Sequence, residues 1–149
     1  MDTSSFFTYE SEGVPVSDAT AIDLLAEEWQ ALLAATETLR FRPSDVVLRA
    51  GERDRALYLL LDGRLEIGGA DTAVSAPAVV GVAAFLDDLP RAVTLRAGTH
   101  GELARLSWDA YEARSARDAR LGRTILLELA RDLAARLRAA GADLPGWTG

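Results

Sequence analysis

Residues 79–95, VVGVAAFLDDLPRAVTL, combine two features that a chain can use to hold a phosphate group. Gly81 opens a turn of small residues, where backbone N–H groups can stay exposed to a ligand. An acidic turn then leads to Pro90 and Arg91, which could aim one cation back at those N–H groups. Val82 stands where a sugar-binding site would benefit from a carboxylate, and valine accepts no hydrogen bond. The stretch therefore leaves two interpretations open, a nucleotide site or the remains of one.

Short runs of alternating apolar and polar residues surround this stretch, and turn residues separate them. The pattern predicts about eight strands. They are expected near residues 38–41, 46–49, 56–61, 64–68, 91–97 and 101–107, with one or two more within 70–80. The Asp62-Gly63 pair predicts a hairpin, because glycine accepts the positive φ of a tight turn. Residues 56–63, ALYLLLDG, are apolar at nearly every position, so we expect that strand to be buried on both faces.

Helical spacing of apolar residues predicts helices at both ends of the chain. Ser17 or Asp18 is expected to cap one or two amphipathic helices, whose apolar face comprises Ile22, Leu25, Trp29, Leu32 and Leu33. Ser107 is expected to cap a short helix. A long amphipathic helix follows and ends at Gly141, a residue type that favours helix C-termini. Its leucine stripe comprises Leu126, Leu129, Leu133 and Leu137.

These elements predict a single domain, residues 18–141, with no internal repeat. Residues 1–17 are polar and rich in turn residues, which predicts a flexible tail, and residues 142–149 form a second, shorter tail. Phe6, Phe7 and Tyr9 leave an alternative open, in which the N-terminal tail docks on this domain or on a partner.

The composition argues against several classes of function. The 149 residues include no cysteine, which rules out disulfides, thiolate catalysis and thiolate metal sites. The net charge of −7 argues against nucleic acid as a partner, because duplex binding depends on neutralising phosphates. No apolar run approaches the ~18 residues of a membrane span. The first residues do not resemble a signal peptide, so we expect a cytoplasmic protein with no membrane partner.

The residues on which most enzymes depend are also scarce. The single histidine, His100, lies within RAGTHGELARL, which reads as a polar turn between two strands. This position favours a turn residue over a metal ligand or a catalytic base. Asp87 and Asp88 fit a solvated turn better than an acid/base pair. We therefore expect that the protein is not an enzyme and has no metal site. We also expect no cofactor beyond a cyclic nucleotide or another phosphate-bearing ligand.

Three segments make the chain resemble the cyclic nucleotide-binding domain family, which includes the sensor half of catabolite activator protein and the regulatory subunits of cyclic AMP-dependent kinase. Residues 40–67 resemble its opening strands, with turns at Gly51-Glu52 and Gly63. Residues 80–95 align without a gap on its phosphate-binding cassette, which is close to F-G-E-L-A-L-L-x-x-x-P-R-A-A-x-V. Residues 101–114 and the long helix resemble its last strand and paired C-terminal helices. The resemblance covers residues of roughly 20 to 140.

The resemblance implies an α+β, mainly β fold: an antiparallel β-roll of the double-stranded β-helix or jelly-roll type, with N-terminal helices and a long C-terminal helix. It also implies a ligand site. Gly81 would allow a close backbone approach, and the N–H groups of Ala83 and Ala84 would face a cyclic phosphate. Arg91 would pair with that phosphate. Ala92 stands where members that prefer cyclic GMP often carry a hydroxyl, so guanine selectivity is not indicated.

The cassette departs from the family pattern at three points. The family's glutamate, which accepts a hydrogen bond from the ribose 2′-hydroxyl, is replaced by Val82, and the aromatic residue before the glycine by Val80. The segment before the cassette is also short. An unpaired ribose hydroxyl would weaken binding by about 1–3 kcal/mol. Glu66 and Glu102 are too generic to nominate as substitutes, and Arg91 has an alternative interpretation as a surface residue paired with Asp87 or Asp88.

These observations predict a stand-alone regulatory or sensor domain with a degenerate pocket. One version binds a phosphate-bearing or nucleotide-like ligand weakly through residues 81–84, Arg91 and Ala92. In the alternative version it binds no ligand and acts as a protein–protein interaction module, through the C-terminal helix or the aromatic tail. That helix could also form a homodimer or cover the roll. Its arginines could contact a base or lie on its solvated face; they are Arg131, Arg136 and Arg138.

Overall fold

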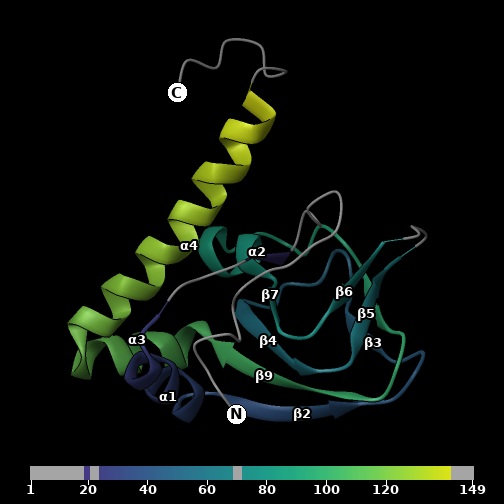
Figure 1. Ribbon diagram of the computed structural model, residues 1–149, viewed down its shortest axis with the longest axis horizontal. Helices are drawn as coiled ribbons and strands as arrows, with labels where there is room; N and C mark the ends of the chain where they lie inside the picture. The colour runs from purple at the N-terminus through teal and green to yellow at the C-terminus, as the bar shows by residue number, and fades with distance from the viewer. Residues whose placement is uncertain (1–18, 21–23, 69–71, 142–149) are drawn as a thin grey trace.

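Two antiparallel sheets face each other and form a roll, with helices at one side (Figure 1). The computed structural model describes residues 19–20, 24–68 and 72–141. The five-stranded sheet has the order β1-β7-β4-β9-β2, and the four-stranded sheet has the order β3-β8-β5-β6. The strands are β1 (Ala19–Thr20), β2 (Glu37–Phe41), β3 (Val46–Leu48), β4 (Ala56–Asp62), β5 (Arg64–Ile67), β6 (Ala73–Ser75), β7 (Ala78–Val80), β8 (Leu95–Ala97) and β9 (Gly101–Ser107).

Strand β4 lies at the centre of the larger sheet, between β7 and β9. Its residues from Ala56 to Leu60 are all buried, as the continuous apolar run predicts. Side chains of alternate residues in a strand point to opposite faces of the sheet. Leu57 and Leu59 accordingly belong to the core between this sheet and the helices, whereas Tyr58 and Leu60 belong to the core inside the roll. One strand thus contributes to both cores of the domain.

Four helices pack around the larger sheet or follow it: α1 (Ala26–Ala34), α2 (Val82–Asp87), α3 (Trp108–Arg117) and α4 (Ala119–Ala140). Ser107 caps α3, as expected, by accepting a hydrogen bond from Ala110 N–H at 3.0 Å. Tyr111 Oη donates to Gly122 O at 2.7 Å and joins α3 to α4. The first half of α4 covers the core through Leu121, Ile125 and Leu129, and its second half extends away from the roll (Figure 1).

The Asp62-Gly63 hairpin is not formed. Gly63 does have a positive φ, of 94°. However, β4 belongs to the five-stranded sheet and β5 to the four-stranded one, so the two strands do not pair. The tight turn instead carries the chain from one sheet to the other. The other glycine turn is as expected, because Gly51 has a φ of 87°.

The N-terminal helix begins later than its sequence pattern predicts. Ala19–Thr20 form strand β1 on the edge of β7, where they satisfy backbone groups that an open edge would expose. Helix α1 starts at Ala26, and Leu25, expected on its apolar face, is 61% exposed at the cap position. Trp29 and Leu32 are buried as expected. Ile22 and the proposed caps Ser17 and Asp18 lie outside the described residues.

Two further expectations need correction. The strand expected over 91–97 covers only Leu95–Ala97, because Arg91 N–H and C=O bond to Glu52 O and Gly51 N–H, each at 2.8 Å. Gly141 ends α4 but retains a right-handed conformation, with φ −63°, so it is not a left-handed cap. The leucine stripe of α4 is buried only in part, since Leu137 is 44% exposed. Among the described helices, none is long and apolar enough to cross a membrane.

Candidate functional site

Gly81 lies at the start of the cassette and is the N-cap of the short helix α2. Its φ of 81° falls in the left-handed region, which favours glycine. A Cβ at this position would stand 2.3 Å from Arg91 Nη1. The turn therefore requires glycine for two reasons, its backbone conformation and the close approach of the arginine.

Arg91 does not lie on the surface of its loop. The residue is 5% exposed, and its guanidinium points inward beneath the cassette. Nη2 donates to Ala56 O at 2.7 Å, and Nη1 donates to Gly81 O at 3.0 Å. Nη2 also lies 3.4 Å from Asp54 Oδ2. The interpretation of Arg91 as a surface residue paired with Asp87 or Asp88 is wrong, since its partners come from the start of β4 and the N-cap of α2.

One nitrogen of Arg91 donates no hydrogen bond to the described residues. Nε is buried and has no hydrogen-bond partner among the described residues. A buried N–H without an acceptor is unfavourable, and such groups in native proteins call for an explanation. Each terminal nitrogen of the cassette arginine therefore donates at least one hydrogen bond, and Nε donates none to the described residues.

The other predicted site residues differ in how far they reach solvent. Val82 is 4% exposed and packs with Phe85 in the core between the larger sheet and the helices. Ala84 is 6% exposed, whereas Ala83 and Ala92 are exposed. The structure thus brings Gly81 and Arg91 into direct contact. It places the side chain of Val82 in a hydrophobic core.

A polar cluster beside Arg91 was missed at the sequence level. Tyr58 Oη donates to Asp54 Oδ2, and Arg105 Nη2 donates to Asp54 Oδ1 at 2.8 Å. Arg105 Nε also donates to Tyr58 Oη at 3.2 Å. The guanidinium carbon of Arg91 lies 5.4 Å from the centroid of the Tyr58 ring. The carboxylate of Asp54 thus holds Tyr58 from β4, Arg105 from β9 and Arg91 from the cassette.

The cluster shifts the proton affinities of its members. Burial raises the pKa of Asp54, but hydrogen bonds from Tyr58 and Arg105 and the charges of Arg105 and Arg91 outweigh burial, so the pKa is lowered. Burial and the hydrogen bond to Asp54 raise the pKa of Tyr58 to about 12. Burial lowers the pKa of Arg105, but its bonds to Asp54 and Tyr58 raise it more. At neutral pH the carboxylate is ionised, the phenol is protonated and both arginines are charged.

The same 51–56 segment also holds the far end of α2. Arg55 Nε donates to Phe85 O at 3.0 Å, and its Nη2 donates to Leu86 O at 3.3 Å. The Arg55 guanidinium lies 3.6 Å above the Trp108 ring, a cation–π contact that joins the cassette to α3. Arg53 Nη1 donates to Asp88 O at 3.1 Å. No side-chain motif announces these contacts, because their acceptors are backbone carbonyls.

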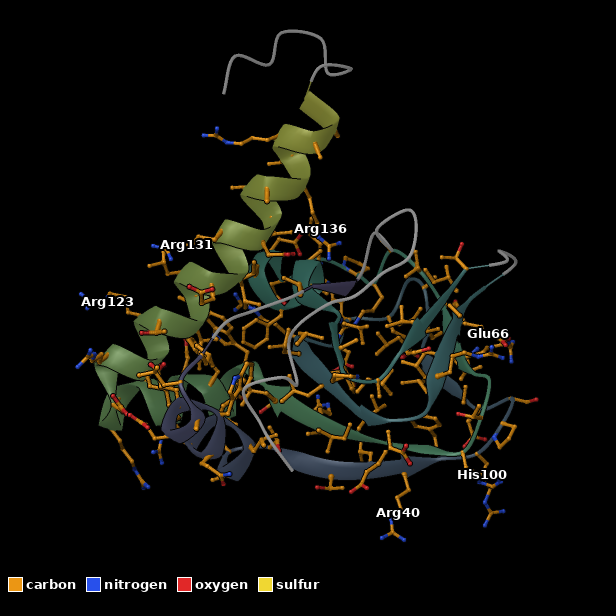
Figure 2. All side chains as sticks on the ribbon, viewed as in Figure 1. Arg40, Glu66, His100, Arg123, Arg131 and Arg136 are labelled. Carbon is orange, nitrogen blue, oxygen red and sulfur yellow. The ribbon has the colours of Figure 1, made fainter. Side chains whose placement is uncertain are left out.

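The remaining candidates lie away from this cluster. His100 and Glu66 are exposed on the four-stranded side of the roll, and Glu66 pairs with Arg64 at 3.2 Å (Figure 2). Arg136 lies on the side of α4 toward the roll and pairs with Asp132 at 2.8 Å, whereas Arg131 points away from it (Figure 2). Arg131 and Arg138 are exposed. Arg131 and Arg138 therefore lie on the solvated face of α4, and Arg136 fits that interpretation less well.

Solved structures with the same fold come from several bacteria. A cyclic nucleotide-binding domain from Methylobacillus flagellatus is 26% identical, with a TM-score of 0.70 over 85% of this chain and 76% of that one. Thermus thermophilus catabolite activator protein is 23% identical, with a TM-score of 0.67 over 80% of this chain and 58% of that one. The N-terminal domain of a transcriptional regulator from Streptomyces coelicolor is 21% identical, with a TM-score of 0.67 over 85% and 92%.

The fold expected from the resemblance, an α+β, mainly β roll with a long C-terminal helix, is confirmed by these structures and by the observed sheets. No curated protein matches the chain. The family model described as "Cyclic nucleotide-binding domain" matches residues 38–118, which is more than half of the 149 residues. The chain therefore belongs to the cyclic nucleotide-binding domain family.

Proposed function

We propose that this chain is a non-enzymatic regulatory domain whose cassette no longer recognises a cyclic nucleotide, and that it acts through contacts with proteins. The observation that carries the proposal is the position of Arg91. Its guanidinium is buried, and its terminal nitrogens donate to Ala56 O and Gly81 O. The cassette arginine serves as an internal brace.

A ligand phosphate would have to compete with this brace. If the terminal nitrogens turned to a phosphate, Ala56 O would lose a donor at a cost of about 1–3 kcal/mol, whereas Gly81 O would keep the N–H of Phe85 at 3.3 Å. Val82 adds a second obstacle, because it offers no acceptor to a ribose hydroxyl and its side chain packs in the core. Both effects weaken cyclic nucleotide binding, and neither requires the fold to change.

Thermal unfolding with a panel of ligands tests the proposal. A ligand that binds the folded state raises its stability by about 2.7 kcal/mol at a hundred times its dissociation constant. We expect the Tm in millimolar cyclic AMP, cyclic GMP or AMP to equal the Tm in sodium chloride of the same ionic strength. A saturable increase in Tm with either cyclic nucleotide would overturn the proposal.

A second version of the function has its own support, because Arg91 Nε is buried without an acceptor among the described residues. In that version the domain holds a small phosphate-bearing ligand weakly at Nε without breaking the brace. Inorganic phosphate would then raise the Tm of the wild type but not that of Arg91→Gln. Sodium chloride at the same ionic strength would change the Tm of both proteins equally. No difference between the two proteins would remove this version.

The long helix offers a surface for a protein partner or a second copy of the chain. Leu127 and Leu137 on α4 are 48% and 44% exposed. Apolar residues exposed on a helix are a common basis for pairing. Light scattering after size exclusion separates the two cases, because a dimer has twice the 16.0 kDa mass of the chain. A monomer would leave α4 available to a different protein.

A further inference from the structure

Four arginines follow one another at every third residue where α3 ends and α4 begins. We call Arg114, Arg117, Arg120 and Arg123 the arginine elbow. The last three are exposed, and Arg123 projects from α4 away from the roll (Figure 2). The chain as a whole has a net charge of −7, so the elbow is a local concentration of positive charge on an acidic protein.

Two acidic residues near the elbow accept hydrogen bonds from groups other than its arginines. Glu112 accepts a hydrogen bond from Trp108 Nε1 at 2.8 Å, and Asp118 caps α4 by accepting from Leu121 N–H at 3.1 Å. Within residues 19–20, 24–68 and 72–141, none of the four arginines forms an ion pair. Arg114 Nε is in addition buried without an acceptor there. The elbow therefore presents four guanidinium groups that form no ion pair within the described part of the chain.

Favourable interaction with a helix dipole accounts for only two of the four arginines of the elbow. Arg114 and Arg117 lie in the last turn of α3, where a cation interacts favourably with the negative end of the helix dipole. Arg120 lies in the first turn of α4, at the positive end, where a cation is unfavourable, and Asp118 at the N-cap accepts from Leu121 N–H and forms no ion pair with Arg120. Arg123 follows one turn later. An acidic binding partner would account for these two residues, since it would pair with them and with the helix N-terminus.

An apolar groove adjoins the elbow. It lies between the end of α1 and α3, has a volume of about 270 Å³, and is lined by Ala34, Ala35, Ala110 and Ala113 together with Arg114 and Arg117. Alanine walls leave room for a larger apolar side chain, and the two arginines place positive charge beside it. The surface therefore fits a peptide that combines an aromatic residue with carboxylates.

The N-terminal segment of this same chain has that chemistry. Residues 2–18 contain four acidic residues and no arginine, lysine or histidine; the acidic residues are Asp2, Glu10, Glu12 and Asp18. They also contain three aromatic residues, Phe6, Phe7 and Tyr9. The segment leads into β1, which packs against α4. Seventeen extended residues span up to ~56 Å, which exceeds the ~33 Å length of a 22-residue helix.

We propose that residues 2–18 dock on the arginine elbow of their own chain, with an aromatic ring in the alanine groove and Glu10 and Glu12 beside Arg117 and Arg120. The docked segment covers a surface that would otherwise attract other acidic peptides. The docking surface lies on α1, α3 and α4, so docking does not depend on whether the cassette binds a ligand.

Cleavage of the full chain by chymotrypsin tests this docking, because the protease cuts after the three aromatic residues of the segment. Cleavage of a segment that docks reversibly follows the population of its open form. We expect Arg117→Glu/Arg120→Glu to be cut there about tenfold faster than the wild type, since attraction becomes repulsion at two positions. Mass spectrometry identifies the cut, and circular dichroism verifies that the fold persists.

The matched control is Arg40→Glu/Arg42→Glu, which changes the charge equally at exposed positions at the end of β2. It should be cut at the wild-type rate. A charge swap completes the test: Glu10→Arg/Glu12→Arg should restore protection to the elbow variant, and protection should not depend on protein concentration. Equal cleavage of all variants would overturn the proposal. Protection that rises with protein concentration would also overturn it, because the segment would then dock on a second copy.

Discussion

Arg91 Nη1 donates to Gly81 O at 3.0 Å, and a Cβ on residue 81 would stand 2.3 Å from that same nitrogen. The glycine and the arginine of the cassette are therefore fitted to each other. The arrangement places the charge of Arg91 under the turn, where it bonds to backbone carbonyls. Its consequences can be measured as changes in stability as well as in binding.

Gly81→Ala should lower the free energy of unfolding in two ways. A non-glycine residue in the left-handed region costs about 1–2 kcal/mol, and the added methyl also displaces Arg91. Gly51→Ala is the matched control, since Gly51 has a φ of 87° and a Cβ there would meet nothing within 4 Å. Urea unfolding should show the larger loss for Gly81→Ala. Equal losses would mean that Arg91 moves aside freely.

Arg91→Met should destabilise the protein by about 1–3 kcal/mol, because it removes a donor from the buried Ala56 O and one of the two donors of Gly81 O, which keeps the N–H of Phe85 at 3.3 Å. Arg96→Met, which removes an exposed arginine from β8, should change the stability by less than about 0.5 kcal/mol. Both values come from chemical denaturation in the absence of ligand. A stability of Arg91→Met close to that of the wild type would contradict the role of Arg91 as a brace.

Asp54→Asn should lower the stability at neutral pH and have a smaller effect in acid. The pKa of Asp54 is lowered from 3.8 in the folded protein, so its carboxylate contributes stability at pH values above about 4. That contribution is lost as the pH falls through the folded-state pKa. The difference in unfolding free energy between wild type and Asp54→Asn should therefore shrink below pH 4. A difference that stays constant from neutral to acid would contradict the lowered pKa.

Tyr58 should ionise later than an ordinary tyrosine. Its pKa is raised from 10.0 to about 12, so the stability from its phenol is intact below pH 10 and is lost as the pH approaches 12. The tyrosinate absorbance of the wild type minus that of Tyr58→Phe should rise near pH 12, or together with alkaline unfolding if this comes first. A rise centred near pH 10 in the folded protein would show that the bond to Asp54 is not maintained.

Local sequence patterns predicted much of the fold because they depend on neighbouring residues. The buried strand at 56–61, the Ser107 cap and the glycine turns at 51 and 63 are of this kind. The Asp62-Gly63 hairpin failed because a turn residue does not determine which sheet receives the next strand. Strand β1 was missed because a two-residue strand has no pattern of its own, and it forms only because β7 offers an edge.

The site was harder to predict than the fold. The sequence identified Gly81 and Arg91 as a unit, but the partners of Arg91 lie 35 and 37 residues away along the chain, at Ala56 and Asp54. One of those partners is a backbone carbonyl, which every residue has. The sequence therefore gave no means to distinguish an arginine that faces a ligand from one that braces the turn.

A calorimetric titration of the wild-type protein with cyclic AMP measures directly whether the cassette still recognises a cyclic nucleotide. Arg91 donates to the carbonyls of Ala56 and Gly81, and Val82 offers no acceptor to the ribose. We therefore predict no saturable heat up to millimolar cyclic AMP. Saturable binding in the micromolar range, with one cyclic AMP per chain, would contradict the role of Arg91 as an internal brace. It would mean that Arg91 leaves its carbonyl partners for a phosphate.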